Sequence, residues 1–288
     1  MIKILLIGLG SIGKRHWRIL KNLNDWGMFE IKLHHFIDWE LADSFGADVA
    51  FICNPTFLHI ETAIQCAERG MHLFIEKPID CKLNNLDKLI DIIESKGLTS
   101  YVAYPLRHHR QAWTLKTMNM PNLTYFVNNS YLEHWRPYQT YSSDWRKGGG
   151  ALLECSHEID LAEYLLGPVE KIDGTFAWKA NSLTNAETTA YLRIDHAGGK
   201  VSWHGFDILS DKKQRFVKHG ATKVDIVPDD QMFLDQTVYF LNNLGNTRIM
   251  NNLIDASKLF RKMIEFREGE YESHYYNSGT IRQQGTSQ

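Results

Sequence analysis

The sequence predicts an α/β domain with a parallel sheet, followed by an α+β domain built on a large open, mainly antiparallel sheet. Three observations support this organisation. The chain has 288 residues, about twice the length of an average domain. Over the first hundred residues, short apolar runs alternate with helical patterns, which is typical of βαβ units. After residue 104 the strand-like stretches become longer and their connections shorter, so we expect one domain over residues 1–104 and a second over residues 105–288.

The first domain is expected to hold five parallel strands. The segment Ile2–Ile7 is short, apolar and rich in β-branched residues, as expected of a strand that is buried on both faces. The other expected strands are Glu30–His35, Val49–Cys53, His72–Glu76 and Ser100–Tyr104. The connecting segments place apolar residues at helical spacing, and glycines follow two of them where a helix C-cap belongs.

Longer strand-like segments dominate the second domain. They are Leu123–Leu132, Lys171–Lys179, Thr188–His196 and Lys200–Leu209. The pair Gly198-Gly199 predicts a hairpin turn between the last two. Two helices are expected here, over Glu154–Leu166 and Leu253–Phe266. Because strands joined by short turns pair antiparallel, this sheet is expected to be largely antiparallel.

The composition narrows the class of protein. Hydrophobic residues make up 43% and charged residues 23% of the chain, which is typical of an ordinary globular protein. The 32 basic and 34 acidic residues leave a formal charge of −2, so no basic excess favours nucleic acid or an anionic membrane as a partner. No apolar segment approaches the roughly 20 residues of a membrane span. The four cysteines are widely spaced, which indicates reduced thiols, a cytoplasmic location and no metal site.

A glycine-rich turn follows directly after the first expected strand. Its sequence is G-x-G-x-x-G, and the residues expected at a cofactor are Gly8, Gly10, Ser11, Ile12 and Gly13. The first glycine permits a tight turn, the second lets the backbone approach a pyrophosphate, and the third packs the following helix against the strand. The helix N-terminus adds the positive end of its dipole. The alternative is a glycine turn without a ligand, but the position between a strand and a helix favours a dinucleotide-binding Rossmann domain.

The second strand leaves the choice between NAD and NADP open. The acidic residue that normally binds the ribose at the end of this strand is missing, because the strand ends in His34-His35. The next acid, Asp38, could reach the ribose, but it also stands at the N-cap position of a short helix over Trp39–Phe45. We favour the cap. Basic residues after the glycine motif could meet a 2′-phosphate, or simply lie in solvent.

Two further loops are expected to face the cofactor, because ligands of open α/β sheets bind at the carboxyl ends of the strands. The third strand is followed by C-N-P-T-F-L-H, and the fourth ends in E-K-P. The cofactor-binding residues expected in these loops are Asn54, Pro55, Thr56, His59, Glu76 and Lys77. A lysine in a dry cleft can also serve in proton transfer. The alternative for this lysine and its neighbouring glutamate is a surface ion pair beside a turn.

Taken together, these motifs resemble those of one known family. The order is G-x-G-x-x-G, N-P-T-x-x-H, E-K-P, then Tyr104 with Arg107, then G-G-G-A-L-L-E-C-S-H-E-I-D over residues 148–160. It resembles the glucose–fructose oxidoreductase, inositol dehydrogenase and rhizopine-catabolism (Gfo/Idh/MocA) family over most of the chain. The resemblance implies a Rossmann domain, a C-terminal domain with a large open sheet, and NAD or NADP as cofactor. The reaction it implies is hydride transfer between the nicotinamide and a hydroxyl or keto carbon of a sugar, cyclitol or nucleotide sugar.

The resemblance also implies roles for individual residues. Lys77 matches the family lysine that touches the nicotinamide ribose and the reacting hydroxyl. His157 matches the histidine that exchanges the substrate proton, a role that suits imidazole because it titrates near neutrality. Many members carry an aspartate four residues before this histidine. Here Leu153 stands four residues before His157. Glu154 stands three residues before His157, one helical turn back, and is therefore the expected partner of this histidine.

Arginines and aromatic side chains supply the expected substrate site. Arginine forks suit a diphosphate or carboxylate, and flat rings suit a sugar or base face. The expected residues are Tyr104, Arg107, Trp135, Arg136 and Tyr141, with Trp145 and Arg146 nearby. The alternative is that half of them belong to the core or to a subunit interface. Their arrangement resembles family members of bacterial surface-sugar gene clusters, which points to an amino sugar or nucleotide sugar.

The leading hypothesis is therefore an NAD(P)-dependent oxidoreductase acting on a carbohydrate. The alternative is a dinucleotide-binding sensor or regulatory protein of the same fold. The presence of both Lys77 and His157 favours catalysis, because a sensor needs neither proton donor. The resemblance further implies a homodimer or homotetramer formed through the open sheets.

Overall fold

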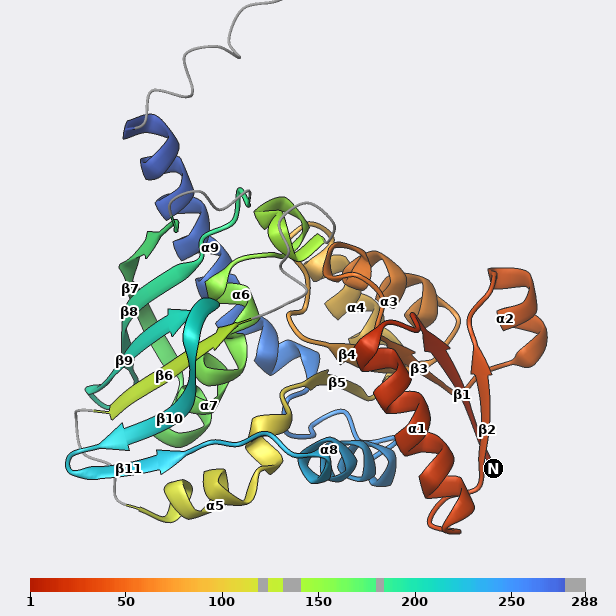
Figure 1. The fold of residues 1–288 in the computed structure, drawn as a ribbon. Coiled ribbons are helices and arrows are strands. Elements are labelled where there is room, and N and C mark those ends of the chain that lie inside the picture. The colour runs from red at the N-terminus through yellow and green to blue at the C-terminus, as the bar shows by residue number, and fades with distance from the viewer. Residues whose placement is uncertain (119–123, 132–140, 180–183, 278–288) are drawn as a thin grey trace, which may run out of the picture.

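The first sheet consists of five parallel strands. The computed structural model describes residues 1–118, 124–131, 141–179 and 184–277 (Figure 1). The strands are β1 (Ile2–Ile7), β2 (Ile31–His35), β3 (Val49–Ile52), β4 (His72–Glu76) and β5 (Ser100–Ala103). Their order is β2-β1-β3-β4-β5, so the predicted parallel sheet is confirmed. The chain runs outward in opposite directions from β1 and β3, and a ligand of such a sheet binds at this reversal.

Four helices connect these strands: α1 (Ser11–Asp25), α2 (Trp39–Phe45), α3 (His59–Glu68) and α4 (Leu86–Lys96). Helix α2 begins after Asp38, whose carboxylate accepts a hydrogen bond from the backbone N–H of Leu41 at 2.9 Å. This confirms the predicted N-cap. Helix α4 ends at Gly97, which adopts a left-handed conformation and donates to carbonyl groups of the last turn, as a glycine C-cap does.

The second sheet is mixed. Its strands are β6 (Thr124–Tyr131), β7 (Val169–Ala177), β8 (Thr189–His196), β9 (Lys200–Asp207), β10 (Leu209–His219) and β11 (Thr222–Asp225). They lie in the order β11-β10-β6-β9-β8-β7, and only the described pair β6–β9 is parallel. The sequence did not predict β10, because its run Ser-Asp-Lys-Lys-Gln has no apolar alternation. The pairing of β10 with β6 is irregular over this same run, between Leu209 and Gln214.

Helices cover one face of the second sheet and leave aromatic rings exposed on the other. The covering helices are α5 (Arg110–Thr117), α6 (Ala151–Glu154), α7 (Ser156–Leu166) and α9 (Leu253–Asn277) (Figure 1). Phe126 and Phe206 are buried on this side. Tyr125, Tyr191 and Trp203 are exposed on the opposite face, where Tyr125 lies beside Trp203 in the β6–β9 register.

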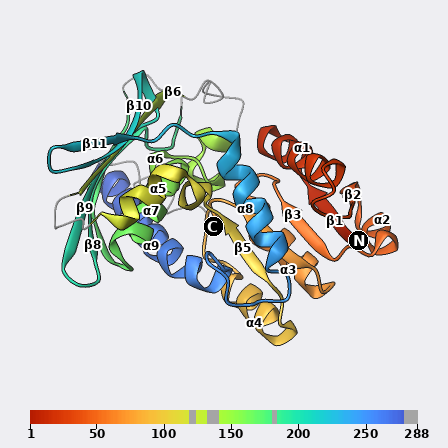
Figure 2. The same cartoon turned by 90° about the horizontal axis from the view of Figure 1, so that it is seen from below.

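After the second sheet the chain returns to the first domain. Helix α8 (Asp230–Asn242) lies beside α1 (Figure 2). Its residue Phe240 packs against Phe51 and Phe74 of the first sheet, in one apolar cluster. The sequence analysis predicted no helix over residues 230–242 and included them in the second domain, because a single sequence does not show which sheet a returning segment covers. Within the described residues, no helix has the length and apolar character needed to cross a membrane.

Candidate active site

The glycine loop has the shape that a dinucleotide requires. Gly8 has a φ of +97°, and a Cβ there would stand 2.6 Å from the backbone of Cys53 and Asn54. A Cβ on Gly13 would stand 1.9 Å from the carbonyl oxygen of Gly8, so this glycine lets α1 pack against the turn. In contrast, nothing lies within 4 Å of a Cβ on Gly10, at the N-terminus of α1. The first turn of α1 carries no acidic residue, so its positive end is available to an anion such as a pyrophosphate.

The loop after β3 lies beside this turn and is tied down by hydrogen bonds. The Asn54 side chain donates to Thr62 at 2.8 Å, and the backbone carbonyl oxygen of Asn54 contacts Nε2 of His59 at the same distance. The Nδ1 atom of His59 contacts the carbonyl oxygen of Pro78 at 2.9 Å. His59 is thus buried between two backbone segments of the predicted cofactor site and shapes them, rather than pointing freely into a cleft.

Glu76 of the E-K-P motif is bound to a residue that the sequence analysis missed. Its Oε1 lies 2.7 Å from Nε2 of His16, which is fully buried on α1. The other carboxylate oxygen accepts a hydrogen bond from the backbone N–H of Lys77 at 3.3 Å. Glu76 therefore connects α1 to the segment that carries Lys77. The sequence offers little indication of this role for His16, because a histidine three residues after the glycine motif looks like an ordinary helix residue.

Lys77 reaches across from the first domain to the second. Its Nζ donates to the carbonyl oxygen of Glu154 at 3.1 Å and lies 3.6 Å from the Glu154 carboxylate. The sequence predicted Glu154 as the partner of His157, and the structure corrects this: the carboxylate pairs with Lys77. The reason is the break between α6, which ends at Glu154, and α7, which begins at Ser156. The two residues therefore do not lie one turn apart on a single helix.

His157 lies in the first turn of α7, with the ring of Tyr104 packed edge-on against it at 5.9 Å between centroids. Its Nδ1 atom is buried and has no hydrogen-bond partner within the described residues. Burial, and then the charges of Lys77 and Arg215, hold the pKa of His157 well below its usual value. The imidazole is therefore uncharged at neutral pH and able to accept a proton.

Three consecutive glycines bring the second domain up to the first. A Cβ on Gly148 would stand 2.5 Å from the Thr56 side chain in the loop after β3. A Cβ on Gly150, whose φ is +114°, would stand 2.2 Å from the carboxylate of Glu187. Glu187 is buried, accepts the backbone N–H of Leu152 at 2.9 Å and receives the hydroxyl of Tyr271. The sequence analysis did not identify this glutamate, because no motif surrounds it.

A cavity of about 770 Å³ opens beside these residues. Its lining includes Glu154, His157, Asn128, Lys213, Arg215 and Asp225. A neighbouring cavity of about 360 Å³ shares His157 and Arg215 and extends toward α1 and α8. Arg215 is the third residue that the sequence analysis missed, since it directly follows the polar run that concealed β10.

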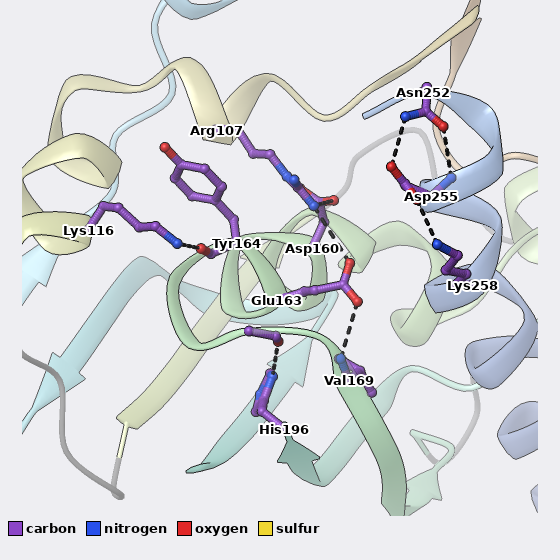
Figure 3. Close-up of polar contacts among 11 residues, drawn as sticks. Arg107, Lys116, Asp160, Glu163, Tyr164, Val169, His196, Asn252, Asp255 and Lys258 are labelled. Carbon is purple, nitrogen blue, oxygen red and sulfur yellow. Dashed lines mark hydrogen bonds and ion pairs between the residues drawn. The ribbon is translucent and has the colours of Figure 1, made fainter. Parts of the chain in front are cut away.

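Arg107 was predicted to bind substrate, but it forms an internal ion pair (Figure 3). Its Nε and Nη2 donate to the two carboxylate oxygens of Asp160 at 2.9 and 2.7 Å, and Nη2 lies 3.7 Å from Glu163. Asp160 is almost fully buried. Arg107 lines a different cavity, together with Lys116 and Tyr164, from the one beside His157. The Arg107 guanidinium is therefore bound to Asp160 of α7, and we do not include it in the candidate substrate site.

The structure places the other predicted substrate residues in different surroundings. Tyr141 is exposed, with its ring 6.4 Å from that of Phe57. Tyr104 is buried against His157 and can position that ring. Trp145 stacks on Tyr271 at 4.5 Å and belongs to the packed interior. Trp135 and Arg136 lie outside the described residues. Where the structure is described, no three His, Cys, Asp or Glu side chains gather as a metal site.

Comparison with known proteins agrees with this architecture. Residues 30–104 match the model of the oxidoreductase family with an NAD-binding Rossmann fold, and residues 124–222 match the GFO/IDH/MocA C-terminal domain. Myo-inositol 2-dehydrogenase of Thermotoga maritima is 25% identical over 200 residues, which are 61% of this chain and 58% of that protein. The chain thus spans little more than half the length of the curated relatives it matches.

Solved structures share the fold across nearly the whole chain. Myo-inositol 2-dehydrogenase from Lactobacillus plantarum superposes with a TM-score of 0.77 at 17% identity, covering 94% of this chain and 98% of that one. The WlbA dehydrogenase from Bordetella pertussis, in complex with NADH and UDP-GlcNAcA, gives a TM-score of 0.73 at 17% identity over 93% of this chain and 97% of that one. The two matched domain models, in the predicted order and on the predicted architecture, place the protein: this chain belongs to the GFO/IDH/MocA family of oxidoreductases and has its NAD-binding Rossmann fold.

Proposed function

We propose that this chain is an NAD(P)-dependent oxidoreductase that transfers hydride between the nicotinamide and a hydroxyl or keto carbon of a sugar, amino sugar or nucleotide sugar. One observation carries the proposal. Lys77, from the carboxyl end of β4, meets Glu154 within 3.6 Å, and Glu154 lines the same cavity as the uncharged His157. A neutral imidazole that lines the cavity, and a cation held against the neighbouring Glu154, suit the proton transfer of alcohol oxidation.

The proposed chemistry divides between the cofactor and two side chains. A bound nicotinamide accepts or supplies the hydride. His157 takes the proton of the substrate hydroxyl during oxidation and returns it during reduction, because its lowered pKa leaves it in the base form. The Lys77 ammonium, held by Glu154, provides a positive charge beside the oxygen on which negative charge develops.

The residues at the glycine loop support a pyridine nucleotide. The open space at Gly10 and the uncapped start of α1 would receive the pyrophosphate. Asp38 is the first acid after β2, and its carboxylate caps α2, so it is not our choice for the ribose. With no strand-end carboxylate to repel a 2′-phosphate, both NADH and NADPH are tested as ligands.

The names of the relatives support the substrate class. Those that match this chain include dehydrogenases of inositol and of levoglucosan, and the WlbA structure holds a nucleotide sugar. The cavity of about 770 Å³ is large enough for a ligand of this size.

The first test is a parallel titration with NADH and NADPH. The eight tryptophans serve as donors for fluorescence transfer to a bound nicotinamide. Micromolar binding of one form supports the proposal and identifies the cofactor with which to screen sugars and nucleotide sugars for turnover. If neither NADH nor NADPH binds, the proposal is refuted. Binding of a cofactor without turnover of any carbohydrate would favour the alternative, a dinucleotide-binding sensor.

We further propose that the protein is a cytoplasmic homodimer or homotetramer. Tyr125, Tyr191 and Trp203 form an exposed aromatic patch on the uncovered face of the second sheet, which suits face-to-face pairing with a second copy. The four cysteines are buried and free of disulfides, as in a reducing compartment. Sedimentation of the wild type and of Trp203→Glu tests the pairing: a monomeric wild type refutes it.

A further inference from the structure

We propose that Arg215 binds an anionic group of the substrate, a carboxylate or a phosphate, and so selects acidic or phosphorylated sugars over neutral ones. This inference rests on the proposed function, because it concerns the cavity beside His157. It specifies that the substrate is anionic and names Arg215 as a residue that determines specificity.

Arg215 is held in place by a buried carboxylate. It stands directly opposite Asn128 in the β10–β6 register, and both side chains reach Glu158 on α7. The Arg215 Nε donates to Oε1 of Glu158, and the Asn128 amide donates to the same oxygen at 3.1 Å. Glu158 is only 3% exposed. The arginine is thus oriented from its Nε side, and much of the entropy of ordering a long side chain is already lost.

The other end of the guanidinium is open. Neither Nη1 nor Nη2 of Arg215 has a hydrogen-bond or ion-pair partner in the described part of the chain, although Arg107 uses both Nε and Nη2 on Asp160. The Arg215 side chain lines both cavities that His157 lines. Two parallel N–H groups facing a cavity form the fork that matches two oxygens of a carboxylate or phosphate.

The surrounding charges favour an anion. Lys213, on the same strand and in the same cavity, has no ion-pair partner among the described residues. The carboxylates that line the cavity already have cations: Glu154 contacts Lys77, and Asp225 lies 3.0 Å from Lys223. A neutral sugar would leave the charge of Arg215 without an opposite charge, whereas an anion would pair with it next to the proposed proton-exchanging histidine.

The test compares matched probes on the full-length protein. Calorimetry measures the affinity for D-glucuronate, glucose 1-phosphate and D-glucose, each with and without saturating NADH. A charge-assisted fork is expected to make at least one anionic probe bind about tenfold or more tightly than glucose. Tighter binding of D-glucuronate would indicate a sugar carboxylate as the ligand, and tighter binding of glucose 1-phosphate would indicate a sugar phosphate.

Two variants assign this preference to Arg215. The double variant Glu158→Gln/Arg215→Gln removes the ion pair together, so no buried charge is left alone; it is expected to bind the anionic probe and glucose equally. Lys218→Gln removes a cation that is exposed on the same strand and lines neither of these cavities, and it is expected to keep the preference. Melting temperatures and NADH affinity show that each variant is folded.

The outcomes separate this inference from the proposed function. A wild type that binds no anionic probe at millimolar concentration, or binds anion and glucose equally, overturns the role of Arg215 even when NADH binds normally. A preference that survives in the double variant overturns it as well. Failure of both NADH and NADPH to bind refutes the proposed function, while the titrations without cofactor still decide whether Arg215 holds an anion.

Discussion

The Nζ of Lys77 donates to the carbonyl oxygen of Glu154 at 3.1 Å, which joins the carboxyl end of β4 to the end of α6. This one contact brings a residue of the Rossmann sheet to the segment that precedes His157. The proposed reaction depends on that meeting of the two domains.

Lys77→Met is expected to retain cofactor binding and lose turnover. A methionine fills similar space but supplies neither charge nor proton, and such groups contribute about 10²- to 10⁴-fold to a rate. Steady-state kinetics with the first carbohydrate found, together with NADH affinity, measure this. Lys88→Met, which removes a solvent-exposed lysine paired with Glu68, is the matched control. Wild-type turnover in Lys77→Met would remove the residue from the mechanism.

Substitutions in the glycine motif should separate binding from folding. Gly10→Ala is expected to leave the free energy of unfolding within about 0.5 kcal/mol of the wild-type value, because the added Cβ meets no atom within 4 Å. It should nevertheless weaken NADH binding by at least tenfold, since the methyl group occupies the space for the pyrophosphate. Gly13→Ala is expected to destabilise the fold, because its Cβ would stand 1.9 Å from the Gly8 carbonyl oxygen. Equal NADH affinity in Gly10→Ala and wild type would contradict the assignment of this space.

Glu187 is expected to support both the fold and the site. Glu187→Ala leaves the Leu152 N–H and the Tyr271 hydroxyl without their buried acceptor, at a cost of about 3 kcal/mol in the free energy of unfolding. Because Leu152 lies in α6 with Glu154, kcat should fall as well. Tyr271→Phe removes the hydroxyl that donates to the Glu187 carboxylate and accepts the Glu187 backbone N–H, and should cost about 2 kcal/mol. Urea unfolding of both variants measures the difference, and an unchanged Glu187→Ala midpoint would exclude a structural role.

The pH dependence of oxidation should reflect His157. A histidine with an ordinary pKa of about 6.5 loses its base form below that pH. Burial and the charge of Lys77 lower the pKa of His157, so the base form persists in more acidic solution. We expect kcat/KM for oxidation to stay constant down through pH 6.5 and to fall only at lower pH. A decline centred at pH 6.5 or above would show that another group, or a differently placed imidazole, is the base.

Protein stability should also decrease in acid, partly because of His204. This residue is buried, stacks on Phe126 and contacts Ser202 at 2.8 Å, and burial holds its pKa well below the usual value. The unfolded chain takes up the proton near pH 6.5, whereas the folded chain does not. Stability is therefore complete above pH 6.5 and is lost as pH falls toward the lowered pKa, by up to about 1.4 kcal/mol per pH unit for one histidine.

Urea unfolding of the wild type and of His204→Phe between pH 7.5 and 5.5 tests this. The variant should show a shallower decline, because one of the buried neutral histidines is gone. Identical declines would mean that other groups dominate the pH dependence.

Local sequence was sufficient for the parallel sheet and the glycine loop. Buried parallel strands need short apolar runs such as Ile2–Ile7, and a pyrophosphate turn needs glycine where a Cβ would strike backbone, as at Gly8 and Gly13. The cap at Asp38 was also predictable, since its hydrogen bond reaches only three residues along the chain. The family resemblance suggested Lys77 and His157 as catalytic residues, and these roles stay a prediction.

Tertiary structure decided which side chains meet. Glu154 follows Lys77 by 77 positions, Glu76 follows His16 by 60, and Arg215 follows Glu158 by 57. No periodicity encodes such distances, because each pair joins elements whose approach depends on how whole helices pack on the sheets. The sequence thus determined the two domain types and the cofactor loop, through interactions within a few residues. The partners of Glu154 and Arg107 were decided by packing, since a buried charge takes the opposite charge that the fold places beside it.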